Sequence, residues 1–278
     1  MKKILCFACA VLMMVLCFAG CGEKASVSAS KALADPDAAK GAEITFTVGF
    51  DAEFPPYGYL DTETNEYTGF DLVLAEEVCK RNGWTLVKKP INWDLKDSEL
   101  EAGTIDCIWN GFTMNGREEE YTFSSPYVDN SQVVVVRKAD KINALKDLAG
   151  KSVEVQKESS AEAALTSTED NEKNLALAKT FKELKSVADY NTALMDLESG
   201  ICDAVAMDIG VAQYKVAAND KLMMLSETVA TEQYAVGFKK GNTALCDKVE
   251  ETLKAMVADG TFAKIAEEWE LSDCVCLK

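Results

Sequence analysis

Leu100-Glu101-Ala102-Gly103-Thr104-Ile105-Asp106-Cys107-Ile108 and Leu197-Glu198-Ser199-Gly200-Ile201-Cys202-Asp203-Ala204-Val205 share one pattern, Leu-Glu-x-Gly-x-x-Asp-x-Ile/Val. In each copy a helical pattern ends at the glycine, and an apolar strand begins near the aspartate. The two copies lie about a hundred residues apart, which is far too long a period for a solenoid. The sequence therefore predicts two lobes built on related helix-strand units.

Short apolar strands alternate with amphipathic helices outside these two stretches. Strands are expected over residues 44–50, 84–88, 133–137 and 152–156, and helices over residues 71–81 and 243–259. This alternation favours an α/β fold with largely parallel sheets.

The start of the chain has the pattern of an export signal. Lys2 and Lys3 precede an uncharged run, and the stretch ends in Ala19-Gly20-Cys21. We expect residues 1–20 to be a cleaved signal peptide rather than a spanning helix, and the polar residues 21–42 to be a flexible tether. The ending resembles a bacterial lipoprotein signal, which implies lipidation of Cys21 and a protein held at the outer side of a membrane. The alternative is an ordinary secretory peptide with an incidental cysteine.

Composition excludes several classes of function. The formal net charge is −17, so the chain lacks the basic surface that nucleic-acid binding needs. Histidine is absent, which removes the commonest general base and the commonest zinc ligand. We therefore expect no catalytic residues of a hydrolytic triad, no metal site and no cofactor.

Six of the ten cysteines remain after the signal peptide and Cys21 are set aside. Cys79, Cys107 and Cys202 lie in apolar patterns, which favours burial as small hydrophobic residues. The pair Cys274 and Cys276 is too closely spaced for a standard zinc half-site. A disulfide between Cys246 and one of that pair stays open at this point.

The two repeats also indicate where a ligand binds. Each predicted strand leads at its carboxyl end to polar residues, Gly111-Phe112-Thr113 in the first copy and Met207-Asp208 in the second. Ligands of open α/β sheets gather outside the carboxyl ends of strands. We expect both segments to face one shared cleft.

Several motifs resemble the polar amino-acid branch of the bacterial extracellular solute-binding proteins, family 3, which serve ABC importers. Their order and spacing cover nearly all of residues 44–270. The matching stretches are Phe54-Pro55-Pro56-Tyr57, Gly69-Phe70-Asp71, Gly103-Thr104-Ile105-Asp106, Arg117, Ser125-Pro126-Tyr127, Ser159-Ser160-Ala161-Glu162 and Gly200-Ile201-Cys202-Asp203-Ala204 with Asp208.

The resemblance implies a two-lobed periplasmic-binding-protein-like fold of type II, with two mixed sheets, flanking helices and two hinge strands. Lobe 1 would comprise residues 43–129 and 234–278, and lobe 2 residues 130–233. The hinge segments would lie near residues 128–131 and 232–236, and closure of the lobes would bury the solute.

The same resemblance assigns the carboxylate of a free amino acid to Arg117. A guanidinium offers paired, charge-assisted hydrogen bonds to a carboxylate. Ser159 and Ser160 open a helix pattern, so their backbone N–H groups are expected to face that carboxylate from the other lobe.

The amino group is assigned to Asp208, with the Gly111 carbonyl and the Thr113 hydroxyl completing its surroundings. The alternative for Asp208 is a helix N-cap, and both roles are compatible. The usual threonine-proline-glutamate step of the family is replaced by Met114-Asn115-Gly116 and is one residue shorter, so the contact from Thr113 is less secure than that from Arg117.

Aromatic and acidic residues are expected around the ligand's side chain. Phe54 is the first candidate for an aromatic wall, with Trp93 and Trp109 behind it, although both tryptophans also fit a core position. Asp51 stands where relatives that bind basic amino acids carry an acid, and the alternative is a solvated carboxylate at a strand end. Glu158 replaces a common glycine and is expected to point to solvent.

These observations predict a lipid-anchored, monomeric receptor that binds a free amino acid and delivers it to a membrane ABC permease by hinge closure. A polar or basic amino acid is favoured, and the sequence does not identify which one. Two alternatives stay open: an amino-acid-sensing receptor, and a dehydratase in which acids such as Asp51 and Glu53 do general acid-base work.

Overall fold

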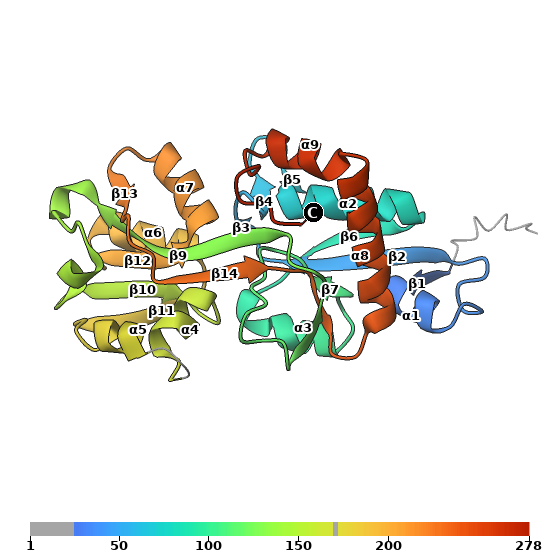
Figure 1. The fold of residues 1–278 in the computed structure, drawn as a ribbon, viewed down its shortest axis with the longest axis horizontal. Coiled ribbons are helices and arrows are strands. Elements are labelled where there is room, and N and C mark those ends of the chain that lie inside the picture. Colours follow the sequence, from blue (N-terminus) through green and yellow to red (C-terminus); the bar gives the residue numbers. More distant parts are fainter. Residues whose placement is uncertain (1–24, 169–171, 278) are drawn as a thin grey trace, which may run out of the picture.

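The computed structural model describes residues 25–168 and 172–277, which form two halves, each built around its own β-sheet (Figure 1). The expected signal peptide and Cys21 lie outside the described residues. We call the half that contains the first repeat lobe 1 and the half that contains the second repeat lobe 2.

The sheet of lobe 1 has six strands in the order β1-β2-β7-β15-β8, with β6 also paired to β2. Strand β2 pairs in parallel with β1, β6 and β7, whereas β15 is antiparallel to β7 and β8. A separate three-stranded sheet, β3-β4-β5, is formed by the three strands that follow β2 in the chain. The strands of both sheets are β1 (Ser26–Ser28), β2 (Glu43–Phe50), β3 (Glu53–Phe54), β4 (Gly58–Asp61), β5 (Glu66–Thr68), β6 (Thr85–Pro90), β7 (Cys107–Ile108), β8 (Tyr121–Phe123) and β15 (Gly237–Lys239).

The sheet of lobe 2 has the order β11-β10-β12-β9-β13, with β14 also paired to β9. Strands β10, β11 and β12 are parallel to one another, and β9 is antiparallel to β12, β13 and β14. Its strands are β9 (Val128–Arg137), β10 (Ser152–Gln156), β11 (Glu183–Val187), β12 (Ala204–Asp208), β13 (Leu222–Met224) and β14 (Ala230–Tyr234).

Two adjacent strands connect the halves. Strands β9 and β14 pair from Ala230 opposite Gln132 to Tyr234 opposite Val128, and Figure 1 shows both running from one half into the other. These are the segments in which the sequence predicted hinges.

Nine α-helices and three short 3-10 helices flank the sheets in the described part of the chain. Helix α2 shows how the sequence sets a boundary, because it ends at Gly83, whose φ of 68° is a left-handed conformation that favours glycine. The helices are α1 (Ala29–Ala34), α2 (Phe70–Asn82), η1 (Trp93–Leu95), α3 (Lys96–Glu101), η2 (Lys138–Asp140), η3 (Leu145–Leu148), α4 (Ser160–Thr166), α5 (Glu172–Ala178), α6 (Tyr190–Ser199), α7 (Ile209–Ala218), α8 (Thr243–Ala258) and α9 (Thr261–Glu268).

The core of lobe 2 lies on both faces of its sheet. Val133 and Val135 of β9 belong to a buried cluster that continues into lobe 1, while Val134 and Val136 belong to a second cluster beneath the other face. Side chains alternate between the two faces of a strand, so a continuous apolar run such as residues 133–136 is buried on both sides. The first cluster therefore runs without interruption between the two halves.

The two repeats have the same geometry in the structure. The Asp106 carboxylate accepts a hydrogen bond from Thr47 N at 2.8 Å, and the Asp203 carboxylate accepts one from Ser152 N at 2.9 Å. Each aspartate also donates its own N–H to the carbonyl oxygen of the same partner residue, at 2.8 Å in both lobes. Each repeat thus fixes its strand beside a parallel neighbour in the same lobe, β7 beside β2 and β12 beside β10.

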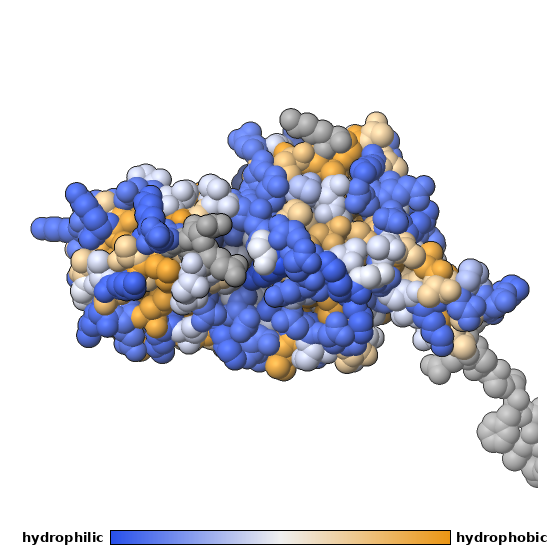
Figure 2. All heavy atoms as spheres, turned by 60° about the horizontal axis from the view of Figure 1, so that its bottom comes forward, coloured by the Kyte–Doolittle hydropathy of each residue, from blue (hydrophilic) through white to orange (hydrophobic). Residues whose placement is uncertain are grey.

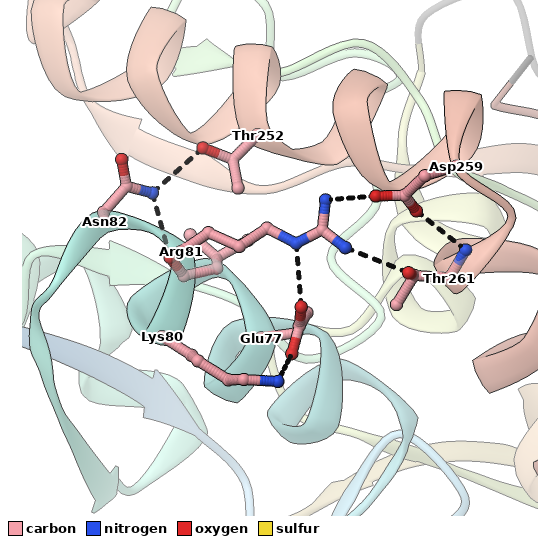
Figure 3. Close-up of polar contacts among 8 residues, drawn as sticks. Glu77, Lys80, Arg81, Asn82, Thr252, Asp259 and Thr261 are labelled. Carbon is pink, nitrogen blue, oxygen red and sulfur yellow. Dashed lines mark hydrogen bonds and ion pairs between the residues drawn. The ribbon is translucent and has the colours of Figure 1, made fainter.

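The chain's C-terminal helices belong to lobe 1, where an arginine ties them to α2 (Figure 3). Arg81 donates to Glu77 at 2.8 Å, to Asp259 at 2.7 Å and to the Thr261 hydroxyl at 2.9 Å. The Arg81 guanidinium holds the pKa of Asp259 well below its usual range. Lobe 1 is therefore assembled from segments far apart in the sequence.

Part of the expected tether is folded, which corrects the prediction of a flexible segment over residues 21–42. Strand β1 pairs in parallel with β2, and Ala29 of α1 is fully buried. Ser28 accepts a bond from Lys31 N at 3.2 Å as the N-cap of α1, and Asn242 donates to Ser30 at 2.7 Å. A short polar segment can be ordered by such contacts with distant residues even though it has no apolar period.

The described cysteines are all free thiols. Cys246 therefore forms no disulfide with Cys274 or Cys276 in this structure. Cys79, Cys107 and Cys202 are buried, as the apolar patterns predicted.

The surface of the molecule is mostly polar. Figure 2 shows a face covered mostly by hydrophilic residues, with small separate apolar patches between them. Among the described residues no helix is long and apolar enough to cross a bilayer.

Candidate functional site

A small cavity of about 10 Å³ lies between the two lobes, with room for about one water molecule. Both lobes contribute to its walls. Its lining residues are Phe54, Trp93, Gly111, Thr113 and Arg117 from lobe 1, and Gln156, Glu158, Ser159, Ser160 and Asp208 from lobe 2. An open groove of about 790 Å³ shares Thr113, Arg117, Glu158, Ser159 and Ser160 with it. The cavity thus adjoins a route to solvent, and an amino acid needs more space than the lobes leave in this arrangement.

Arg117 forms the positive end of the cavity. It lies in the turn after Gly116, which has a left-handed φ of 78°. Its guanidinium donates to the Thr113 carbonyl at 3.1 Å and to the Glu158 carbonyl of lobe 2 at 3.4 Å, and it lies 5.1 Å from the Phe112 ring centroid. The partners that hold the guanidinium here are neutral, so it can exchange them for a carboxylate.

Ser159 and Ser160 face Arg117 from the start of α4. The Ser159 hydroxyl oxygen is the N-cap of this helix and accepts from Glu162 N at 3.1 Å. Glu158, just before it, has a left-handed φ of 59°. Its carboxylate lies 3.8 Å from Lys96 Nζ of lobe 1, and it lines the cavity rather than facing solvent alone as expected.

Asp208 forms the negative end. It is the last residue of β12, is only 4% exposed, and uses no side-chain bond to cap α7. The capping hydrogen bond proposed as its alternative role is therefore absent. Four side chains donate to its carboxylate instead: Asn130 at 2.9 Å, Gln132 at 2.6 Å, Tyr234 at 2.6 Å and Tyr190 at 2.8 Å.

Asp51 lies behind the lining residues rather than among them. Its carboxylate accepts from Gln156 Nε2 of lobe 2 at 2.6 Å and from Glu53 N at 2.8 Å. Burial raises the pKa of Asp51 to about 6, against the lowering effect of these two hydrogen bonds. The alternative of a solvated carboxylate at a strand end is thus wrong for this arrangement, because Asp51 is buried in a contact between the lobes.

The aromatic residues separate into wall and core. Phe54 packs 5.8 Å from Tyr57 and 5.9 Å from Tyr190 of lobe 2, measured between ring centroids. Trp93 packs 5.8 Å from Phe112, whereas Trp109 is fully buried 6.4 Å from Tyr127 and does not line the cavity. Trp109 is therefore a core residue.

Gly111 and Thr113 border the cavity from the segment after β7. A Cβ at Gly111 would meet Phe54 at 2.8 Å and Tyr234 at 2.9 Å, and its φ is 55°. Gly111 N donates to Asp71 of α2 at 2.6 Å. Glycine is required here because the aromatic walls approach its backbone closely.

Several residues of the site were missed by the sequence analysis. Gln156 had a usable signal, since it ends the predicted strand 152–156 at its carboxyl end. Asn130 and Gln132 stand two residues apart before an apolar strand, which places both amides on one face. Glu232 and Tyr190 have no local signal, because only the pairing of strands and the packing of α6 bring them to Asp208.

The sequence profile of the bacterial extracellular solute-binding proteins, family 3, matches residues 46–272. The chain belongs to this family. It is 30% identical over 226 residues to the L-cystine-binding protein TcyA of Bacillus subtilis strain 168, with 80% of each chain covered. It is 29% identical over 286 residues to the ABC transporter glutamine-binding protein GlnH of the same strain, covering 98% of this chain and 99% of the relative.

Solved structures show the same relationship. A substrate-binding protein of an ABC uptake transporter from Streptococcus pneumoniae, with bound histidine, aligns with a TM-score of 0.74 at 35% identity, covering 81% of this chain and 92% of that one. The type II fold and the family membership predicted from the sequence are confirmed. The family consists of amino-acid-binding components of ABC importers rather than enzymes, so the dehydratase alternative is not supported.

Proposed function

We propose that this chain is the lipid-anchored receptor of an amino-acid importer, and that it holds one free amino acid, with a polar or basic side chain, between Arg117 and Asp208. The observation that carries the proposal is the placement of these two opposite charges in one cavity, one from each lobe. A zwitterion needs both charges at once, and an amino acid that contacts both lobes stabilises their closure.

The proposed roles follow the partners of each group. The ligand's carboxylate replaces the carbonyl oxygens around Arg117, because a charged acceptor forms the stronger bond to a guanidinium. Its ammonium group lies beside Asp208, with Gly111 and Thr113 at the same end. Gln156 lines the cavity where the ligand's side chain lies, with Asp51 hydrogen-bonded behind it, which favours a ligand with polar atoms there.

A thermal-shift panel tests the proposal on the mature protein. The standard amino acids, cystine and ornithine are each added, and one or a few are expected to raise the Tm by about 5–10 °C at 100 times the Kd. Arg117→Ala is expected to abolish the shift for every compound.

Arg81→Ala is the matched control, because it removes another lobe 1 arginine far from the cavity. It should lower the Tm without ligand but keep the ligand shift. A wild-type protein that responds to no amino acid, or an Arg117→Ala variant that responds like the wild type, would refute the assignment.

The anchor is tested in a bacterial host by incorporation of labelled palmitate. The wild-type chain and a Cys17→Ser control should be labelled and partition with membranes, whereas Cys21→Ser should be neither labelled nor retained. Labelling of Cys21→Ser would exclude this cysteine as the lipidated residue.

A further inference from the structure

A layer of amide and carboxyl groups lies behind Asp208. Asn130 Nδ2 donates to Asp208 at 2.9 Å and to Glu232 at 2.7 Å, while Gln132 Nε2 donates to the same two carboxylates at 2.6 and 2.7 Å. Two acids are therefore bridged by two amide nitrogens.

The pairing of the two connecting strands creates this layer. Glu232 on β14 stands opposite Asn130 on β9, and Ala230 stands opposite Gln132. Glu232 is only 9% exposed. The second acid is thus fixed by the backbone that joins the lobes.

The layer contains more acceptors than donors. No lysine or arginine of the described residues forms an ion pair with either carboxylate. Asn130 Oδ1 and Gln132 Oε1 are also buried, without a hydrogen-bond partner in the same part of the chain. Flipping these amides would aim their oxygens at the carboxylates, so the nitrogens must face the acids. Two acids this close disfavour double ionisation unless a proton or a cation joins them.

The donors are divided unequally between the two acids. Asp208 also receives hydrogen bonds from two tyrosines, whereas Glu232 shares the two amide groups and, in addition, meets Thr113. Burial, and after it the charge of Asp208, raise the pKa of Glu232 to about 7. Hydrogen bonds to a carboxylate favour its charged form, so Glu232 is the acid that holds a proton.

Within residues 25–168 and 172–277, no other group near the pair supplies the positive charge or the proton that would let both acids stay close together. The tyrosines around the pair stay neutral, because burial raises the pKa of each well above the usual value. The titratable and charged groups that face the pair are Tyr57, Tyr190 and Tyr234 at close range, and Arg117, Glu120, Glu158 and Glu162 along the adjoining groove. Arg117 is held at the opposite end of the cavity by carbonyl oxygens.

Building on the proposed role of Asp208, we propose that Glu232 is a second acid of the ammonium end, and that its proton leaves for water when the ligand's ammonium group binds. The O–H bond of Glu232 breaks, the proton passes to water, and the ammonium group keeps its three hydrogens. The charged pair then faces a cation. Binding strengthens as pH rises, and a ligand without an ammonium group is rejected.

The first measurement needs no ligand. The mature protein is labelled with ¹³C at the glutamate carboxyl carbon, and the Glu232 resonance is identified by its loss in Glu232→Gln. It is expected to titrate near pH 7. Titration in the ordinary glutamate range, at about 4.3, would overturn the proposal whether or not an amino acid binds.

The second measurement counts protons by calorimetry in buffers of different ionisation enthalpy. The probe is whichever of cystine, arginine, glutamine or histidine gives the largest thermal shift. At about pH 6 the wild type should release close to one proton more than Glu232→Gln, and at about pH 8 this difference should vanish. Glu232→Gln is expected to bind about tenfold more weakly than the wild type at the higher pH, with a flatter pH dependence.

Glu120→Gln is the matched control, since Glu120 is exposed along the adjoining groove. It should keep the wild-type proton release. Equal release in the wild type and Glu232→Gln, with binding intact, would overturn the inference but not the proposed function. Failure of every amino acid to bind would remove the proposed function, and the carboxyl titration would still decide the protonation of Glu232.

Discussion

The two ends of the cavity hold their charges in different ways. Arg117 bonds to two backbone carbonyls, at 3.1 and 3.4 Å, and one of these belongs to the other lobe. Asp208 is buried beneath four side-chain donors at 2.6 to 2.9 Å. The positive end can change partners, whereas the negative end is built into the fold.

This difference separates binding from stability. A guanidinium held by neutral carbonyls gains by exchanging them for a ligand carboxylate. When the Asp208 carboxylate is removed, the hydroxyls of Tyr190 and Tyr234 lose their acceptor. The two amides keep only their bonds to Glu232. We therefore expect both ends to be needed for binding, but only the negative end to be needed for the stability of the protein.

The largest effect is expected from truncating the two ends in turn. Arg117→Ala and Asp208→Ala should each weaken amino-acid binding by more than about 100-fold, because each removes one partner of a buried charge contact. Asp208→Ala should also lower the free energy of unfolding by about 2 kcal/mol, and Arg117→Ala by less than about 1 kcal/mol. Calorimetric titration and urea unfolding measure the two quantities. Equal losses of stability would contradict the difference between the ends.

Asp51 can be compared with Asp208, because it is also a buried acid but has two hydrogen-bond donors rather than four. Its pKa is raised from 3.8 to about 6 in the folded protein. The folded state therefore holds this proton more tightly than the unfolded state, and the contribution of Asp51 to stability falls as pH rises between these values. Once the carboxyl is ionised, its burial destabilises the protein.

The stability of Asp51→Asn relative to the wild type should consequently increase as the pH rises. The difference in unfolding free energy, variant minus wild type, is expected to grow by about 2 kcal/mol between about pH 4 and pH 7. Urea unfolding across this range measures it, and the wild type supplies the contribution of every other acid. Parallel curves for the two proteins would show that Asp51 does not titrate as its burial implies.

The tyrosines at Asp208 should have a smaller effect. Tyr190→Phe and Tyr234→Phe each delete one donor and keep the ring, so each should lower the free energy of unfolding by about 1 kcal/mol. The loss should be the same with and without saturating amino acid, since these donors hold Asp208 in both cases.

Tyr214→Phe is the matched control for these variants, because Tyr214 is 44% exposed on α7 and does not line the cavity. It should change stability by less than about 0.5 kcal/mol. A loss confined to the ligand-bound protein would mean that Tyr190 and Tyr234 act on the ligand rather than on Asp208.

The sequence predicts those parts of the molecule that depend on local patterns. Helix α2, strand β10 and the helix-strand repeats follow from apolar period, glycine stops and spacing. Arg117 and Asp208 were identified by their place in family motifs. Residues 26–34 were misjudged because their order comes from pairing with β2 and from the contact between Asn242 and Ser30, more than 200 residues apart.

The layer behind Asp208 was missed for the same physical reason. Glu232 and Asn130 lie a hundred residues apart, and only the register of β14 on β9 makes them neighbours. A one-residue shift of that register would turn Glu232 to the opposite face. No pattern within either segment specifies such a register.

The smallest effect, and the closest comparison of the two lobes, concerns the aspartates of the repeats. Asp106→Asn and Asp203→Asn each replace a charged acceptor of one backbone N–H by a neutral one, at Thr47 and Ser152. Because these backbone contacts are equivalent, each variant should lower the free energy of unfolding by about 0.5–1 kcal/mol and leave amino-acid affinity unchanged. Asp203→Asn should lie at the upper end, since it also loses an ion pair with Arg137 at 3.8 Å. Chemical unfolding and calorimetric titration of the pair test this. A large loss in one lobe alone would show that the repeated motif does not play the same structural role in both.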